Sequence, residues 1–300
     1  MGISRRSALK VMAAATATMV GTALSTHETQ AAAVVGPAPD AVGMLYDATR
    51  CVGCKACMVA CNEANDVTPD TSASDGLWDM PLDLSEHAKN IIKLYRDPGT
   101  GAQSFVKRQC MHCLDPACVG ACMLGALQKN EKGIVSYNPD YCVGCRYCEM
   151  GCPFNVIKFE WSRALPKMVK CELCRHRIAK GQGPACCEVC PVGAVIYGKR
   201  SDLLADAHQR LAQNPGRYVP NVYGEHEVGG TQVLYLAHVD FEKLGLPAYS
   251  DESVPTRVRT IQGTIYKGFV APVALYGLLA AMVLRNREKP GSAKAKEGQP

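Results

Sequence analysis

Aromatic residues are scarce in this sequence of 300 residues: phenylalanine, tryptophan and tyrosine together make up 6%. Packing of aromatic rings therefore does not dominate the core. The body of the chain also has little net charge, although the formal net charge of the whole chain is +5. The N-terminal region contributes +3 through Arg5, Arg6 and Lys10, and the residues after Leu284 contribute a net +3. The rest of the chain therefore carries about −1. A body this neutral argues against a nucleic-acid-binding surface.

Long apolar runs are also few, and the first of the two lies near the N-terminus. Arg5 and Arg6 precede an apolar run over residues 11–24, and Ala31 and Ala33 fit an A-x-A cleavage site. This arrangement resembles the twin-arginine export signal, which moves folded proteins across a membrane. We therefore predict a twin-arginine signal peptide over residues 1–33. An uncleaved basic membrane anchor is the alternative.

The second apolar run covers residues 268–284. At a rise of about 1.5 Å per residue it would span roughly 26 Å, which is short for a membrane helix, but residues from 261 onwards can extend it. Positive residues follow at once, and positive charge stays on the cytoplasmic side. The pattern predicts a transmembrane anchor at 261–287 and a cytoplasmic tail at 288–300. The chain would cross the inner membrane once, with its body facing the periplasm. A buried core helix is the alternative.

What the chain has in abundance is cysteine, with 17 residues. Sixteen of them fall into four sets of four, and Cys187 is left over as a buried spare. The sets are Cys51, Cys54, Cys57 and Cys61; Cys110, Cys113, Cys118 and Cys122; Cys142, Cys145, Cys148 and Cys152; and Cys171, Cys174, Cys186 and Cys190.

Three kinds of chemistry compete for these thiols. Disulfides suit an exported chain, but a body of this size needs no such dense cross-linking. Structural zinc draws two C-x-x-C pairs together across a spacer. The first and third sets instead follow C-x2-C-x2-C-x3-C, and Pro153 follows the third. This is the bacterial ferredoxin run that binds a 4Fe–4S cluster, in which the fourth cysteine ligates the neighbouring cluster. We therefore predict iron–sulfur clusters, and expect Cys152 to bind a different cluster from Cys142.

The flanking residues predict an α+β fold. Short apolar or β-prone stretches precede the four sets, at residues 43–50, 104–109, 133–141 and 165–170. Strand, loop, helix and strand make up the half-unit of a ferredoxin. The runs "CVGCKACMVAC" and "CVGCRYCEMGC" are near copies and suggest an internal repeat. Gly53 and Gly144 allow the backbone to approach a cluster closely.

Several other residues carry weaker predictions. His112 and His176 lie within the cysteine motifs and are interpreted as structural, because the thiols already complete the ligand sets. Five basic residues near the loops can raise cluster potentials, but most are interpreted as solvated surface charge: Lys55, Lys107, Arg146, Lys158 and Lys170. Residues 62–105 form an insertion with a strand at "NIIKLYR", either a docking surface or a plain excursion. Periodicity predicts a helix over 201–213, followed by a strand in "GGTQVLYLAHV".

The order and spacing of the four sets resemble the four-cluster electron-transfer subunits of bacterial membrane oxidoreductases. The segments "NIIKLY", "KRQCMHC", "CVGCRYC", "KCELC", "CCEVCPVGAVIYG" and "YGEHEVGGTQVLYL" are most similar to the iron–sulfur subunit of the hydrogenase-2 type. The resemblance implies tandem ferredoxin-like modules, each with two 4Fe–4S clusters, over residues 43–200. The insertion at 62–105 interrupts them, an extension at 201–260 packs on the core, and one C-terminal transmembrane helix follows.

The resemblance also implies four 4Fe–4S clusters with a nested pairing of loops. Cluster 1 would use Cys51, Cys54, Cys57 and Cys190; cluster 2 would use Cys110, Cys113, Cys118 and Cys152; cluster 3 would use Cys142, Cys145, Cys148 and Cys122; and cluster 4 would use Cys171, Cys174, Cys186 and Cys61. Asn62 and Met123 stand where a proline would follow the run, which affects geometry rather than ligation.

The function implied is electron transfer without catalysis by the chain itself. Its partners would be the small and large subunits of a periplasmic nickel–iron hydrogenase and an integral membrane quinone-reacting subunit. The alternative within the same family is the β-subunit of a molybdopterin enzyme such as formate dehydrogenase. The alternative from a different class is a structural zinc or disulfide module.

Overall fold

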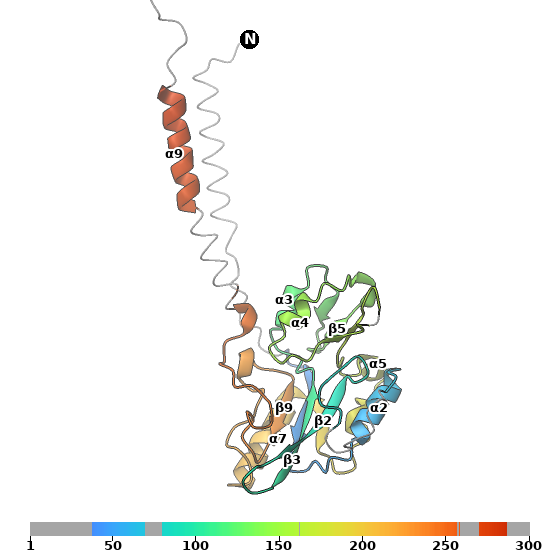
Figure 1. Cartoon of the computed structure of the whole chain (residues 1–300). Coiled ribbons are helices and arrows are strands. Elements are labelled where there is room, and N and C mark those ends of the chain that lie inside the picture. Colours follow the sequence, from blue (N-terminus) through green and yellow to red (C-terminus); the bar gives the residue numbers. More distant parts are fainter. Residues whose placement is uncertain (1–37, 70–79, 162, 257, 259–269, 287–300) are drawn as a thin grey trace, which may run out of the picture. The chain divides into compact units, whose positions relative to one another are not determined.

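The computed structural model describes residues 38–69, 80–161, 163–256, 258 and 270–286 (Figure 1). The chain divides into two units, Met1–Thr256 and Arg257–Pro300. The predicted signal peptide at 1–33, the predicted tail at 288–300 and residues 261–269 of the predicted anchor lie outside the described residues.

The first unit is built on a three-stranded sheet in the order β8-β1-β9. These strands are Val195–Lys199, Val42–Asp47 and Val233–Leu236. β8 pairs antiparallel with β1, so that Tyr46 lies opposite Val195, whereas β9 pairs parallel, so that Leu45 lies opposite Leu234. The first strand of the fold thus becomes the centre of the sheet, between two strands from the C-terminal half of the unit.

The two faces of β1 pack into different parts of the core, because side chains alternate along a strand. Leu45 belongs to a cluster with Leu203 and Ala207 of α7, a helix over Arg200–Gln213 that contacts β1 and β8. Met44 and Tyr46 belong to the main core on the other side. The helix predicted over 201–213 is confirmed, with buried residues on its sheet-facing side.

A long hairpin, β2 and β3, lies beside this sheet. Its strands are Asn90–Arg96 and Gln103–Gln109, paired antiparallel with Ile92 opposite Lys107. Tyr46 donates a hydrogen bond to the carbonyl of Phe105 at 2.9 Å, which ties the hairpin to the sheet. The strand predicted at "NIIKLYR" is confirmed as β2. Ile91 and Ile92 are buried in the main core, so this part of the predicted insertion contributes to the core and is no plain excursion.

A second, smaller cluster of buried side chains lies under two short helices, which Figure 1 shows beside β5. It contains Leu127, Val135, Ile157 and Phe159. The helices, α3 and α4, span Ala117–Ala121 and Tyr147–Met150 and contact each other. The short hairpin strands around them are β4 (Leu127–Lys129), β5 (Val135–Tyr137), β6 (Lys158–Phe159) and β7 (Met168–Val169), and η1 covers Pro139–Tyr141.

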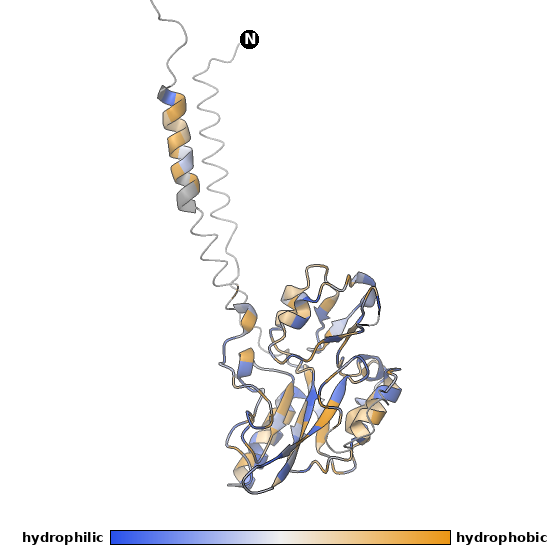
Figure 2. Cartoon of the chain, viewed as in Figure 1, coloured by the Kyte–Doolittle hydropathy of each residue, from blue (hydrophilic) through white to orange (hydrophobic). Residues whose placement is uncertain are grey.

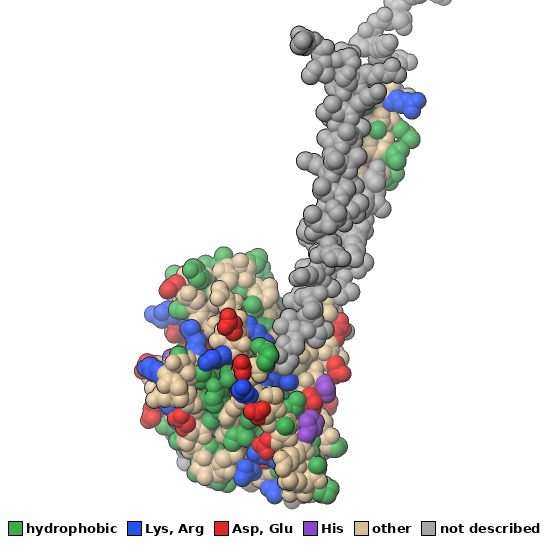
Figure 3. All heavy atoms as spheres, turned by 180° about the vertical axis from the view of Figure 1, so that it is seen from behind, with side chains coloured by type: hydrophobic (Ala, Val, Ile, Leu, Met, Phe, Trp, Pro, Cys, Tyr) green, Lys and Arg blue, Asp and Glu red, His purple; other side chains and the backbone are tan. Residues whose placement is uncertain are grey.

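Each cysteine set follows a strand and runs into a short helix, as the flanking residues predicted. The strands are β1, β3, β5 and β7. The helices are α2 (Ala56–Ala64), α3, α4, α5 (Arg175–Ile178) and α6 (Ala185–Glu188); η2 (Glu227–Gly229) lies in the later extension. The mixed α and β composition agrees with the expected α+β class. Acidic and basic side chains are interspersed on the face shown in Figure 3.

The second unit contains one described helix, α9, over Val270–Asn286. Figure 2 shows it as hydrophobic over much of its length, and side chains such as Leu275, Tyr276 and Val283 are exposed. Among the residues that the structure describes, no helix has the length and hydropathy required to cross a membrane.

Candidate metal centres

All seventeen cysteines lie within the described part of the chain, and all are free thiols. Most are buried or half-buried, and only Cys54 and Cys145 are exposed. Within the described residues, no three Cys, His, Asp or Glu side chains form a site for a single metal ion. The question is which thiols the fold brings together.

Two of the cysteine loops share one backbone conformation. Gly53 and Lys55 have φ angles of 69° and 60°, and Gly144 and Arg146 have φ angles of 70° and 63°. Lys55 and Arg146 are the N-caps of α2 and α4, so the same pair of left-handed residues turns each loop into its helix. The repeated sequence thus folds as a repeated structure, with the three thiols of C-x2-C-x2-C on one tight turn.

We predict that Gly53→Ala disrupts the first of these loops. A side chain at Gly53 would overlap the ring of Phe105 and would also force a left-handed backbone on a non-glycine residue. Gly101 has the same φ of 69° with nothing within 4 Å, so Gly101→Ala is a matched control for the backbone strain alone. Gly53→Ala should lower the free energy of unfolding by about 1–3 kcal/mol more than Gly101→Ala, measured by urea denaturation without oxygen. Equal losses would contradict the overlap.

The strand pairing brings Cys190 to the first loop. Cys190 precedes β8 and Cys51 follows β1, and because these strands are antiparallel, both residues lie at the same end of the sheet. Asp47 donates its backbone N–H to the carbonyl of Ala194 at 2.8 Å, which joins the two loops. Burial raises the pKa of Cys51, and the neighbouring thiols Cys190 and Cys54 raise it further. The structure therefore places Cys190 beside the first loop.

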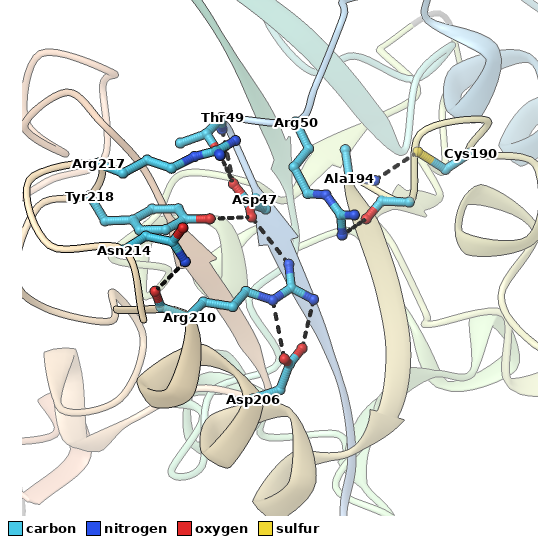
Figure 4. A network of polar contacts seen from close by, with 11 residues as sticks. Asp47, Thr49, Arg50, Cys190, Ala194, Asp206, Arg210, Asn214, Arg217 and Tyr218 are labelled. Carbon is cyan, nitrogen blue, oxygen red and sulfur yellow. Dashed lines mark hydrogen bonds and ion pairs between the residues drawn. The ribbon is translucent and has the colours of Figure 1, made fainter. Parts of the chain in front are cut away.

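A network of polar groups around the buried Asp47 holds this end of the sheet (Figure 4). Asp47 is 1% exposed, and its carboxylate accepts hydrogen bonds from Thr49, from Arg210 at 3.1 Å and from Tyr218 at 3.1 Å. Arg210 lies on α7 and also pairs with Asp206. The network connects the helix and the later extension to the residues that lead directly into Cys51.

Cys61 lies beside the fourth set. The side-chain amide of Asn65 lies 3.6 Å from the sulfur of Cys61 and 3.9 Å from that of Cys174. Burial raises the pKa of Cys61, and Cys186 and Cys174 also raise it. Contact between α2 and α6 accounts for this, because α2 carries Cys61 and α6 carries Cys186.

The two middle sets exchange thiols in the same way. Burial raises the pKa of Cys113, and Cys110, Cys152 and Cys118 raise it further, so Cys152 lies with the second loop. In return, Cys122 lies with the third loop. A cavity of about 270 Å³ is lined by four thiols of the predicted cluster 3 together with apolar side chains: Cys122, Cys142, Cys145 and Cys148. The contact between α3 and α4 positions both crossed cysteines.

The thiols thus lie in four groups, called groups 1 to 4 after the predicted clusters 1 to 4 with the same cysteines, and ligation by them stays a prediction. The donor set suits iron–sulfur clusters, which proteins hold with cysteine thiolates. One further observation fits. His112 is fully buried and its Nδ1 accepts a hydrogen bond from the backbone N–H of Val135 at 3.0 Å. Its Nε2 must therefore carry the proton, and among the described residues it has no acceptor. A sulfur of a bound cluster would supply one.

Sequence reasoning missed the position of two cations. Lys107 and Lys170 are 1% and 2% exposed, so their interpretation as solvated surface charge is wrong. The Nζ of Lys170 donates hydrogen bonds to the carbonyls of Val135 and Cys171. Lys107 lies within β3 and Lys170 directly follows β7, both next to buried hydrophobic residues. Their place in these β-prone stretches is the sequence signal that indicates burial.

Comparison with known proteins agrees with this geometry. The family described as "4Fe-4S dicluster domain" matches residues 102–200. The chain is 41% identical to the hydrogenase-2 operon protein HybA of Escherichia coli O157:H7, over 83% of this chain and 86% of that protein. It is 37% identical to the iron-sulfur subunit of the nitrate-inducible formate dehydrogenase of Escherichia coli K12, over 80% of this chain and 81% of that subunit.

A formate dehydrogenase iron-sulfur subunit of Haemophilus influenzae is 36% identical, over 79% of this chain and 78% of that subunit. These similarities extend over most of each chain, well beyond the residues that the dicluster family matches. The chain therefore belongs to the family of ferredoxin-type iron–sulfur electron-transfer subunits that includes HybA and the iron-sulfur subunits of formate dehydrogenases.

Proposed function

We propose that this chain binds four 4Fe–4S clusters through the sixteen grouped cysteines and relays electrons between a periplasmic nickel–iron hydrogenase and a membrane quinone-reacting subunit. Each bound cluster would take up and release one electron at a potential set by its surroundings. The observation that carries the proposal is the grouping of thiols, three from one loop and one from another, in four places.

The order of the groups supports conduction. Cys186 of group 4 contributes to the raised pKa of Cys57 in group 1, after burial. Cys110 of group 2 likewise contributes, after burial, to the raised pKa of Cys171 in group 4. Cys148 of group 3 contributes to the raised pKa of Cys118 in group 2. Since such contributions come from nearby thiols, neighbouring groups follow the order 1, 4, 2, 3.

The two ends of this order reach the surface. The exposed thiols belong to them, Cys54 in group 1 and Cys145 in group 3. Tyr147 and Met150 beside group 3 are 56% and 86% exposed, and exposed apolar side chains of this kind suit contact with another protein. Electrons would be exchanged with partners at groups 1 and 3, while the thiols of groups 2 and 4 are all buried or half-buried.

The hydrogenase partner follows the 41% identity to HybA, and its assignment belongs to this proposal. A molybdopterin enzyme such as formate dehydrogenase is the second candidate, favoured by the 37% identity to a formate dehydrogenase subunit. The sequence patterns that predict a twin-arginine signal at 1–33 and an anchor at 261–287 are the basis for proposing a single-pass protein of the inner membrane with its body in the periplasm.

Purification of the full chain in mild detergent without oxygen tests the proposal. We expect about sixteen irons and as many acid-labile sulfides per chain, because each 4Fe–4S cluster contributes four of each. Fewer than about twelve irons per chain would contradict four clusters, with allowance for loss during purification.

The same preparation tests the partners and the location. Co-purifying nickel supports the hydrogenase, and molybdenum or tungsten supports the alternative. Extraction from the membrane fraction should require detergent, and recovery of the chain alone in the soluble fraction would count against both the anchor and the complex.

A further inference from the structure

Lys107 is a buried cation inside the main core. It lies on β3 and is 1% exposed. Its Nζ donates a hydrogen bond to Oε1 of Gln109 at 2.6 Å. The hydroxyl of Tyr235 donates to its backbone carbonyl at 2.8 Å, which holds the strand in place. No ion pair joins Lys107 to a carboxylate among the residues described.

Packing places Lys107 near thiols of two different cysteine groups. Ile92, opposite Lys107 on β2, donates its backbone N–H to the sulfur of Met58 at 3.4 Å, and the neighbouring Asn90 donates its side-chain amide to the carbonyl of Cys57 at 3.4 Å. These contacts hold the hairpin against α2, which carries Cys57 and Cys61 and in turn contacts α6 with Cys186.

Burial disfavours the charged ammonium, but the thiolates of Cys186, Cys57 and Cys171, followed by Cys61, outweigh burial and raise the pKa of Lys107. Cys57 belongs to group 1, and the other three belong to group 4. Conversely, Lys107 opposes the rise in the pKa of Cys57 and Cys61 that burial causes. One cation thus faces two neighbouring groups at once.

A buried charge acts strongly because the protein interior screens it poorly. Reduction makes an iron–sulfur cluster more negative, so a fixed positive charge nearby stabilises the reduced form and raises the reduction potential. Because no carboxylate among the described residues forms an ion pair with Lys107, its charge acts mainly on the neighbouring thiols and on clusters bound by them.

We propose that Lys107 sets the reduction potentials of clusters 1 and 4 by holding one permanent positive charge between their thiols. The inference rests on the proposed function, because it requires clusters at these two groups. Lys107 would act through its charge and would bind no iron. The two clusters at one end of the electron path would therefore be raised together by one side chain.

Redox titration of the full chain, followed by electron paramagnetic resonance at low temperature, tests this. Lys107→Met removes the charge and keeps the apolar stem. We expect two cluster potentials to fall, each by at least tenfold in the reduction equilibrium, which is about 59 mV for one electron. The exposed Lys132 gives a matched control, and Lys132→Met should leave all potentials unchanged.

A second variant covers the case in which Lys107→Met does not fold. Gln109→Glu keeps the shape of the residue that accepts the hydrogen bond from Lys107, and places a negative charge against the ammonium. It should lower the same two potentials.

The outcomes separate the two hypotheses. Wild-type protein without iron overturns the proposed function, and this inference falls with it. Wild-type protein with full iron, together with an iron-replete Lys107→Met whose potentials all match wild type, overturns only the role of Lys107. If Lys107→Met carries no iron, unchanged potentials in Gln109→Glu overturn it instead.

Discussion

Cys61→Ala is expected to remove about four irons from the chain and to abolish the cluster held by the fourth loop, not the one held by its own loop. The physical reason is the position of α2, which places Cys61 beside Cys174 and Cys186. A 4Fe–4S cluster needs a thiolate at each of its four irons, so loss of one ligand destabilises the whole cluster.

Double variants show which thiols share a cluster, because changes that act on one site are not additive. Cys61→Ala combined with Cys171→Ala should lose no more iron than Cys61→Ala alone. Combined with Cys57→Ala it should lose about four further irons, because Cys57 belongs to another cluster. Cys187→Ala is the matched control, since Cys187 is the thiol outside the four groups, and it should retain full iron. The crossing would be refuted if Cys57→Ala added no loss to Cys61→Ala.

Removing the carboxylate of Asp47 should be among the most damaging changes outside the cysteines. Asp47 is buried and accepts hydrogen bonds from Thr49, Arg210 and Tyr218 (Figure 4). Arg210 keeps its pair with Asp206, but deleting the carboxylate also removes the acceptor of Thr49 and Tyr218, and leaving such donors unsatisfied costs about 1–3 kcal/mol. We expect Asp47→Ala to lower the free energy of unfolding by this amount, measured by urea denaturation without oxygen.

Asp206→Ala is the matched control, because Asp206 pairs with the same guanidinium from a position that is 37% exposed. Exposed ion pairs contribute about 0–1 kcal/mol, so this loss should be small. Equal effects of the two variants would mean that burial of Asp47 is not what makes its ion pair important.

The cysteine sets, the strands before them and α7 could be predicted because the information is local. A C-x2-C-x2-C run determines a tight turn, and the periodicity around Leu203 and Ala207 determines an amphipathic helix. The parallel pairing of β9 with β1 could not be predicted, since it joins residues such as Leu45 and Leu234 that no local pattern connects.

The burial of charged side chains in the core also could not be predicted from the sequence. Lysine is usually exposed, and the burial of Lys107 depends on the β2–β3 hairpin lying against Tyr235 and the thiols of distant loops. The tautomer of His112 depends likewise on the backbone of Val135, which lies 23 residues further along the chain. Tertiary contacts, and not composition, decide these features.

The crossing of thiols between loops has a consequence for biosynthesis. Groups 2 and 3 use cysteines up to Cys152, whereas group 1 needs Cys190. At about 5–20 residues per second, the ribosome would supply Cys190 roughly two to eight seconds after Cys152. The nascent chain would therefore offer the complete sites of groups 2 and 3 to the assembly machinery first, and groups 1 and 4, at the other end of the order, would be completed later.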